Sequence, residues 1–135
     1  MMRPAAAFSL AVDVDYGDAE GPRGYFEFTG GEIEFQRDVA PARTFVRAGD
    51  VARLLAAGRG RGADPSNTVI YGDREPAAPL RFSDEGPRHK LLDALGDLAL
   101  LERPLRGEVV VVRGSHGLHV RALRAWRASE KREGR

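Results

Sequence analysis

The sequence contains no cysteine, only two lysines and no long apolar run. Without cysteine, a disulfide scaffold and a thiolate metal site are both excluded, and the composition fits a reducing compartment. No apolar run approaches the roughly 20 residues that a membrane-spanning helix needs, and the first residues form too short an apolar stretch for a signal peptide. The sequence therefore predicts a cytoplasmic protein without a membrane span.

An excess of charge of either sign is also missing. The 21 lysine and arginine residues are balanced by 20 aspartate and glutamate residues, for a formal net charge of +1. A basic cluster occurs near the end of the chain, but Glu130 and Glu133 interrupt it, so no nucleic-acid partner is predicted. The 135 residues are 42% hydrophobic, which predicts one domain over 1–135 with its own core and a charged tail at 130–135.

Periodicity predicts strands in the first third and a mixed unit in the middle. Residues 8–16 alternate between apolar and small or acidic side chains, and 25–29 and 32–36 are predicted as two further strands around a glycine turn. A helix over 51–57, capped by Asp50, precedes a strand over 68–71. These elements predict a small βαβ insert at 46–72.

The last third contains the most regular patterns. A helix is predicted over 87–101 and another over 116–129, the second capped by Ser115. Four consecutive valines at 109–112 predict a strand that is covered on both sides. The predicted fold is an α+β two-layer sandwich, with a mostly antiparallel sheet of about five strands and the two long helices on one face.

Candidate chemistry lies on these two helices. His89, Asp93 and Asp97 follow each other at four-residue spacing, so they share one helix face and could hold a metal ion. A solvated helix face without metal is the alternative. His116 stands at a helix N-terminus after the valine strand, where it could serve catalysis or be only a first-turn residue, and His119 is expected to be partly exposed.

Several motifs resemble one enzyme family. The stretch 81–98, RFSDEGPRHKLLDALGDL, resembles the most distinctive helix of the zinc-dependent UDP-3-O-acyl-N-acetylglucosamine deacetylases of lipid A biosynthesis. The segments 8–10 (FSL), 42–45 (ARTF), 72–73 (GD) and 114–118 (GSHGL) match the same family in the same order. The resemblance covers about residues 8–126, which correspond to the second of the two similar domains of such enzymes.

The resemblance implies a metal site shared between two domains. It assigns zinc as the cofactor, with His89 and Asp93 as the two ligands on this domain. The third ligand, a histidine, and the general-base glutamate belong to the other domain. It therefore implies a separate first-domain polypeptide, or self-association, as the partner.

The resemblance also implies roles for other side chains. His116 matches the catalytic histidine, and Asp97 matches the carboxylate that orients it. Thr44 matches a threonine that hydrogen-bonds the developing oxyanion. Lys90 matches a lysine that contacts the substrate, a UDP-sugar precursor of lipid A.

The insert departs from the family pattern. Larger apolar side chains are typical of the acyl-chain passage at five positions, where this chain has small, polar or charged residues: Ala48, Arg59, Gly60, Arg61 and Pro65. Val51, Leu54 and Ile70 keep their apolar character and are predicted to contact the acyl chain. Arginine in an apolar passage is costly unless its charged end reaches water, so a long acyl substrate is not assured.

Two functions are left open. In the first, the chain is half of a split deacetylase and is inactive without its partner. In the second, it is a truncated or degenerate paralogue without catalysis that acts as an interaction or regulatory module. The six retained polar residues favour the first, and the metal content of the chain alone and with a partner separates the two.

Overall fold

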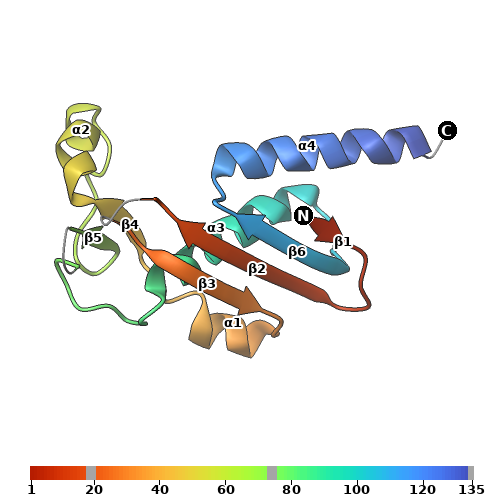
Figure 1. Ribbon diagram of the computed structural model, residues 1–135, viewed down its shortest axis with the longest axis horizontal. Helices are drawn as coiled ribbons and strands as arrows, with labels where there is room; N and C mark the ends of the chain where they lie inside the picture. The colour runs from red at the N-terminus through yellow and green to blue at the C-terminus, as the bar shows by residue number, and fades with distance from the viewer. Residues whose placement is uncertain (18–20, 73–75, 134–135) are drawn as a thin grey trace.

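The computed structural model describes residues 1–17, 21–72 and 76–133, and within them it has the α+β class predicted above (Figure 1). Short 3-10 segments follow β4 and α3. In chain order the helices and strands are β1 (Met2–Arg3), β2 (Phe8–Asp15), β3 (Arg23–Phe28), α1 (Glu32–Asp38), β4 (Thr44–Arg47), α2 (Val51–Ala56), β5 (Thr68–Tyr71), α3 (Glu85–Leu98), β6 (Gly107–Val112) and α4 (His116–Glu133).

The main sheet has four strands in the order β1-β6-β2-β3. The pairs β1–β6 and β2–β3 are antiparallel, while β2 and β6 run parallel. The prediction of a mostly antiparallel sheet is therefore confirmed, although the sheet has four strands rather than about five. Strands β4 and β5 form a separate parallel pair, the small βαβ unit that was predicted.

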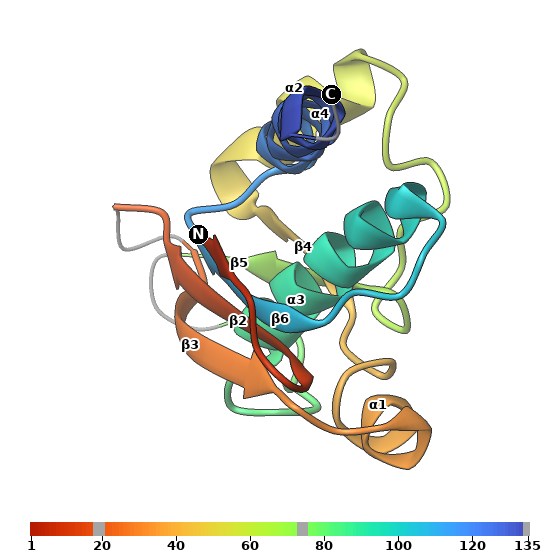
Figure 2. The ribbon, with the colours of Figure 1, turned by 90° about the vertical axis from the view of Figure 1, so that its right-hand side faces the viewer.

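The core lies between the main sheet and α3. Alternate residues of β2, including Leu10 and Val12, are buried on the sheet face that α3 covers (Figure 2). Helix α3 contributes Leu91 and Leu98 to the same core, from the side of the helix opposite its polar row. Each fully buried aliphatic side chain of this kind contributes about 1.5–3 kcal/mol, which anchors α3 to the sheet.

Helix α4 lies beside α3 at the β1–β6 end of the sheet (Figure 2) and contributes Leu123 to the core. In the part of the chain that is described, no helix covers the opposite sheet face. The prediction that the valine strand is covered on both sides is therefore wrong. Val109 is buried beneath the helices, whereas Val112 is exposed, because alternate side chains of β6 point to opposite faces.

The strand predicted over 32–36 is also wrong, because these residues form helix α1. Its first turn is stabilised by Glu34, whose carboxylate accepts a hydrogen bond from the backbone N–H of Gly31 at 3.0 Å. Phe35 packs against the core while Ile33 is 75% exposed, so the alternation of apolar residues in the sequence does not correspond to a buried sheet face. A seven-residue helix replaces the second strand of the predicted hairpin.

The remaining boundaries lie close to the predictions. Strand β5 has the predicted limits, and α2 ends before Gly58, whose φ of +72° suits glycine. Asp50 precedes α2 but does not cap it with its side chain; the carboxylate instead accepts hydrogen bonds from Arg47 and Arg53. Helix α4 extends to Glu133, beyond the predicted end at residue 129. Asp73 and residues 134–135 of the predicted tail lie outside the described residues.

Among the described residues, no helix combines the length and apolar character needed to cross a membrane.

Candidate functional site

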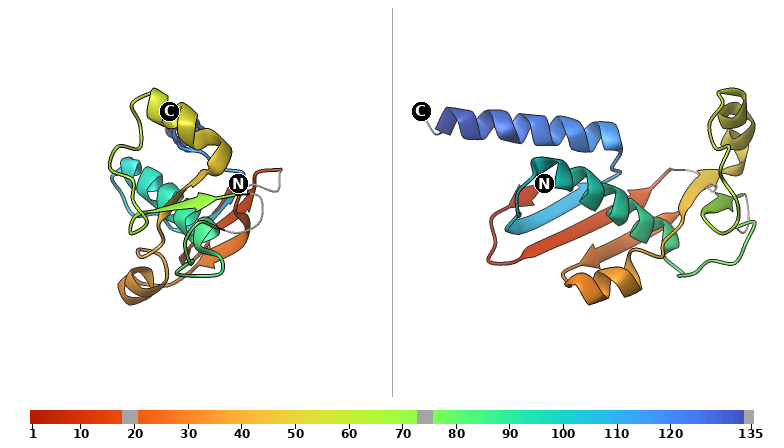
Figure 3. Two further views of the ribbon diagram at one scale, coloured as in Figure 1. Left: turned by 90° about the vertical axis from the view of Figure 1, so that its left-hand side faces the viewer. Right: turned by 180° about the vertical axis from the view of Figure 1, so that it is seen from behind.

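Helix α3 presents the predicted polar row, and α4 completes it. His89, Asp93 and Asp97 are spaced four residues apart on α3, so successive members lie one helical turn apart on one face. The right-hand view of Figure 3 shows α3 crossing one face of the main sheet. His116, at the first position of α4, reaches this face although 27 sequence positions separate it from His89. The predicted convergence of these four side chains is confirmed.

His89 is held at the beginning of the row by a backbone carbonyl. Its Nδ1 lies 3.0 Å from the carbonyl oxygen of Ala42, which can only accept, so Nδ1 carries a proton, and in the neutral ring Nε2 presents a lone pair. Nε2 lies 3.4 Å from Oδ1 of Asp93. Burial lowers the pKa of His89, but the hydrogen bonds to Asp93 and Ala42 outweigh burial and raise it overall.

Asp93 lies between three neighbours. Besides His89, Lys90 donates a hydrogen bond to its Oδ2 at 2.7 Å, and Nε2 of His116 lies 3.8 Å from its Oδ1. Burial raises the pKa of Asp93, yet the contacts with His89 and Lys90 prevail and lower it to about 2. Asp93 therefore remains a carboxylate at neutral pH, the form that can bind a cation.

Asp97 joins the two helices through a single oxygen atom. Its Oδ2 lies 2.8 Å from Nδ1 of His116 and 2.6 Å from Nδ1 of His119, so it accepts hydrogen bonds from both rings. The hydrogen bond that was predicted between Asp97 and His116 is confirmed. Ser115 caps α4 as predicted, because its hydroxyl accepts a hydrogen bond from the backbone N–H of Leu118.

His119 is the member that sequence reasoning missed. It was expected to be partly exposed, but its side chain is only 7% exposed, whereas that of His116 is 67% exposed. Its Nε2 is buried without a hydrogen-bond partner in the described structure. This atom lies so close to Gly114 that a Cβ there would approach it to 2.5 Å. The i, i+3 spacing from His116 on α4 was the available signal, since such residues share one helix face.

Two groups of donors could hold a metal ion. The side chains of Asp97, His116 and His119 offer ligand atoms that all lie within 4.8 Å of one another. The pair implied by the family resemblance, His89 and Asp93, offers one imidazole nitrogen and one carboxylate oxygen on the same side of α3. Imidazole and carboxylate suit zinc, but a catalytic zinc site usually has three protein ligands, so this pair fits as an incomplete site.

The predicted acyl-chain residues line a cavity of about 460 Å³ in the βαβ unit. Val51, Leu54 and Ile70 all contribute to its wall, as does Thr44. Of the two arginines expected in this passage, Arg59 lines the cavity and Arg61 lies outside its wall. The cavity is therefore mainly apolar, with two charged residues, Arg59 and Asp64, in its wall.

Lys90 and Thr44 occupy different surroundings. Lys90 is held by Asp93 and also lines a second hollow together with Tyr16, Arg113 and Ser115. Thr44, at the start of β4, is exposed at the cavity. Its neighbour Phe45 places its ring edge-on to that of His89, with the ring centroids 6.3 Å apart. The cavity thus begins beside the polar row.

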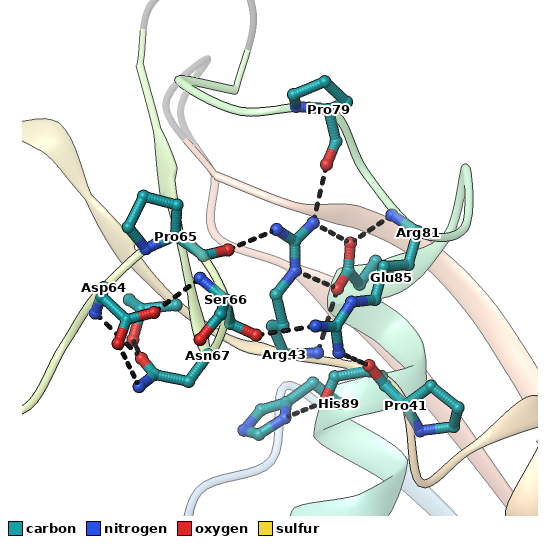
Figure 4. Close-up of polar contacts among 12 residues, drawn as sticks. Pro41, Arg43, Asp64, Pro65, Ser66, Asn67, Pro79, Arg81, Glu85 and His89 are labelled. Atoms are coloured by element: carbon teal, nitrogen blue, oxygen red, sulfur yellow. Dashed lines mark hydrogen bonds and ion pairs between the residues drawn. The ribbon is translucent and has the colours of Figure 1, made fainter.

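A buried ion pair fixes the segment that precedes β4 (Figure 4). The side chains of Arg43 and Glu85 are 6% and 1% exposed and share hydrogen bonds of 2.8 and 2.9 Å. Burial raises the pKa of Glu85, but hydrogen bonds from Arg43 and from the backbone N–H of Arg81 lower it to about 2. Because Glu85 begins α3, the pair fixes the position of this helix against Ala42, the residue that orients His89.

Comparisons with known proteins point to one family. The family model for UDP-3-O-acyl N-acetylglycosamine deacetylase matches residues 1–127. The UDP-3-O-acyl-N-acetylglucosamine deacetylase of Anaeromyxobacter dehalogenans is 37% identical over 120 residues, which are 87% of this chain and 39% of the relative. That of Brucella ovis is 38% identical over 131 residues, 95% of this chain and 46% of the relative.

The chain thus spans less than half the length of these curated relatives. The match nevertheless extends over nearly all of its own residues and includes both helices of the polar row. The chain therefore belongs to the UDP-3-O-acyl N-acetylglycosamine deacetylase family.

Proposed function

We propose that this chain is one half of a zinc-dependent deacetylase that removes the N-acetyl group from a UDP-3-O-acyl-N-acetylglucosamine precursor of lipid A. The observation that carries the proposal is the continuous row His89, Asp93, His116 and Asp97, which α3 and α4 bring together in a chain of this family. Such a row is expected of a metal-assisted hydrolase in which acid catalysis lies next to the metal ligands.

His89 and Asp93 would hold the zinc, whose chemistry is to activate water and to polarise the amide carbonyl. The tautomer of His89 suits this role, because its Nδ1–H is engaged by Ala42 and its Nε2 is available. Lys90 donates a hydrogen bond to Asp93. In the complex its ammonium group would contact the negatively charged substrate, either in place of Asp93 or together with it. Thr44 would donate a hydrogen bond to the developing oxyanion from the start of β4.

His116 would act as the general acid through Nε2. Its Nδ1–H is held by Asp97, so Nε2 faces Asp93, and in the protonated ring the Nε2 proton can pass to the leaving amine. The N-terminus of α4 disfavours a positive charge on His116, and the Asp97 carboxylate offsets that effect. The apolar cavity beside Thr44 would receive the acyl chain of the substrate.

The site needs a partner that supplies a third metal ligand and a general base. Two protein ligands leave at least two metal positions to water, so zinc should bind weakly to the chain alone. The curated relatives contain additional length that could provide these groups. The partner would be either a first-domain polypeptide or another copy of this chain.

The test measures zinc content and release of acetate by the chain alone and mixed with the first-domain part of a relative. We expect turnover and tight zinc only in the mixture. Asp93→Asn should lower zinc affinity at least tenfold, whereas Asp84→Asn should not, because Asp84 pairs with Arg88 at the beginning of the same helix. Absence of zinc and of turnover in every mixture would favour the paralogue without catalysis.

A further inference from the structure

The segment formed by residues 42–45 touches both the metal-ligand pair and the apolar cavity. On one side, the carbonyl of Ala42 holds Nδ1 of His89, and the ring of Phe45 lies edge-on to the His89 ring. On the other side, Thr44 and Phe45 form part of the cavity wall. Four consecutive residues therefore separate the cavity from a proposed metal ligand.

Within this segment, Arg43 contacts three residues that are distant in the sequence. Its backbone N–H and its Nε both donate to Oε1 of Glu85, one helical turn before His89. Its two terminal nitrogens also donate to the carbonyl oxygens of Pro65, at 2.8 Å, and Pro79, at 2.7 Å. Pro65 lines the cavity, and so does Ala78, the residue before Pro79. One buried guanidinium thus connects two parts of the cavity wall to the helix that contains His89.

The contacts with Pro65, Pro79 and Glu85 are all made by the same guanidinium group. A displacement of Pro65 or Pro79 by a ligand in the cavity would have to break or move hydrogen bonds of the same guanidinium that fixes Glu85. A ligand that fills the cavity without displacing them would instead restrict the segment to the position in which Ala42 orients His89. Restriction of this kind lowers the entropic cost of a second binding event, so the two sites should favour each other.

We propose that filling of the cavity by an apolar chain strengthens metal binding at His89 and Asp93, with Arg43 as the positioning residue that couples the two sites. The inference rests on the proposed function, because it takes His89 and Asp93 as the metal ligands. By linkage, the metal must strengthen binding of the apolar chain by the same factor. The acyl chain of the substrate would thereby strengthen binding of the metal that assists hydrolysis of the substrate.

The test uses the full chain, Co²⁺ as the metal and 1-octanol as a neutral apolar probe, at one fixed pH. Methyl resonances of Leu54 and Ile70 report filling of the cavity, and Co²⁺ absorption reports metal binding. We expect saturating octanol to raise Co²⁺ affinity about fivefold, at the lower end of typical coupling between two sites. The reverse titration, octanol into the Co²⁺-loaded chain, should give the same factor.

Arg43→Lys keeps the positive charge but loses the fork that contacts Glu85, Pro65 and Pro79, so it should abolish the fivefold gain. Arg88→Lys is the matched control. Arg88 is a half-buried arginine on α3 that, like Arg43, binds a carboxylate (Asp84) and a backbone carbonyl (Asp38), but it does not line the cavity. The gain should persist in this control. If Arg43→Lys does not fold, Glu85→Gln takes its place, because it removes the charge while it keeps the size of the side chain.

The outcomes separate this inference from the proposed function. Co²⁺ affinity that Asp93→Asn leaves unchanged would contradict both, because the metal would then bind elsewhere. Co²⁺ bound at Asp93 with the same affinity in the presence and absence of octanol would overturn the coupling alone. Equal loss of the gain in Arg43→Lys and Arg88→Lys would overturn the role of Arg43, since general loosening of α3 would then suffice.

Discussion

The two parts of α3 hold polar side chains under opposite conditions. In the first turn, Glu85 accepts hydrogen bonds from Arg43 and Arg81 in an almost fully buried setting. In the later turns, Asp97 holds His116, whose side chain is 67% exposed, and His119, whose Nε2 has no partner in the described structure. We call the first cluster closed, because its polar groups are buried and paired, and the second open, because His116 is exposed although His119 beside it is buried. Closed clusters hold a backbone in place, whereas open ones are available to a ligand or a partner.

The largest expected effect is on the closed cluster. Glu85→Ala leaves the Arg43 guanidinium buried without its carboxylate, which should lower the free energy of unfolding by about 3–5 kcal/mol. His116→Ala, in the open cluster, should change it by less than about 0.5 kcal/mol. Urea unfolding followed by circular dichroism measures both. Equal losses in the two variants would show that the clusters do not differ in the way described here.

A pH titration of stability sharpens the same contrast. The pKa of Glu85 falls from 4.5 to about 2 on folding, so its contribution is fully present above about pH 4.5 and is lost as pH falls toward 2. The contribution amounts to about 3 kcal/mol. In Glu85→Gln, the free energy of unfolding should therefore decrease less steeply between pH 4.5 and 2 than in the unchanged chain, as measured by urea unfolding at several pH values. The exposed Glu27→Gln is the control, and an unchanged slope for Glu85→Gln would contradict the prediction.

A glycine pair probes the open cluster with a smaller effect. A Cβ at Gly114 would lie 2.3 Å from Cγ1 of Val111 and 2.5 Å from Nε2 of His119, so Gly114→Ala must shift these two side chains, one of which is held by Asp97. We expect a loss of about 1–3 kcal/mol in thermal unfolding, together with a shift of the His119 ring resonances. Gly117→Ala meets only the end of Arg121 at 3.5 Å and should be neutral or slightly stabilising. A tolerated Gly114→Ala would show that His119 is loosely packed.

Local patterns predicted the elements on which the site is built. The four-residue spacing of His89, Asp93 and Asp97 on one helix was sufficient to place them on one face, and Ser115 correctly indicated the beginning of α4. The family resemblance predicted the contact between His116 and Asp97, which spacing alone could not predict because it joins two helices. The roles of these residues remain predictions.

The failures share a physical cause, which is that neighbours from distant parts of the chain decide burial. The alternation at 32–36 suggested a strand, but Phe35 contacts the core from a helix while Ile33 faces solvent. Burial of His119 depends on its packing against Gly114 and on Asp97 of another helix; the i, i+3 spacing from His116 indicates a shared helix face but not that burial. The Arg43–Glu85 pair, 42 positions apart, was likewise not visible in any local pattern.

The parallel pairing of β2 with β6 has a consequence for the order of folding. The pairing joins Leu10 to Val109 across about 100 residues. In the sequence, α3 with most of the polar row lies between these two strands, and α4 with His116 follows the second one. Closing so long a chain segment costs about 4 kcal/mol of chain entropy before the contacts that reward it exist. Local contacts in α3 and α4 can form earlier, but they have no shared sheet to pack on until the closure occurs. His89 and His116 should therefore meet late in folding, in the same cooperative step that completes the main sheet.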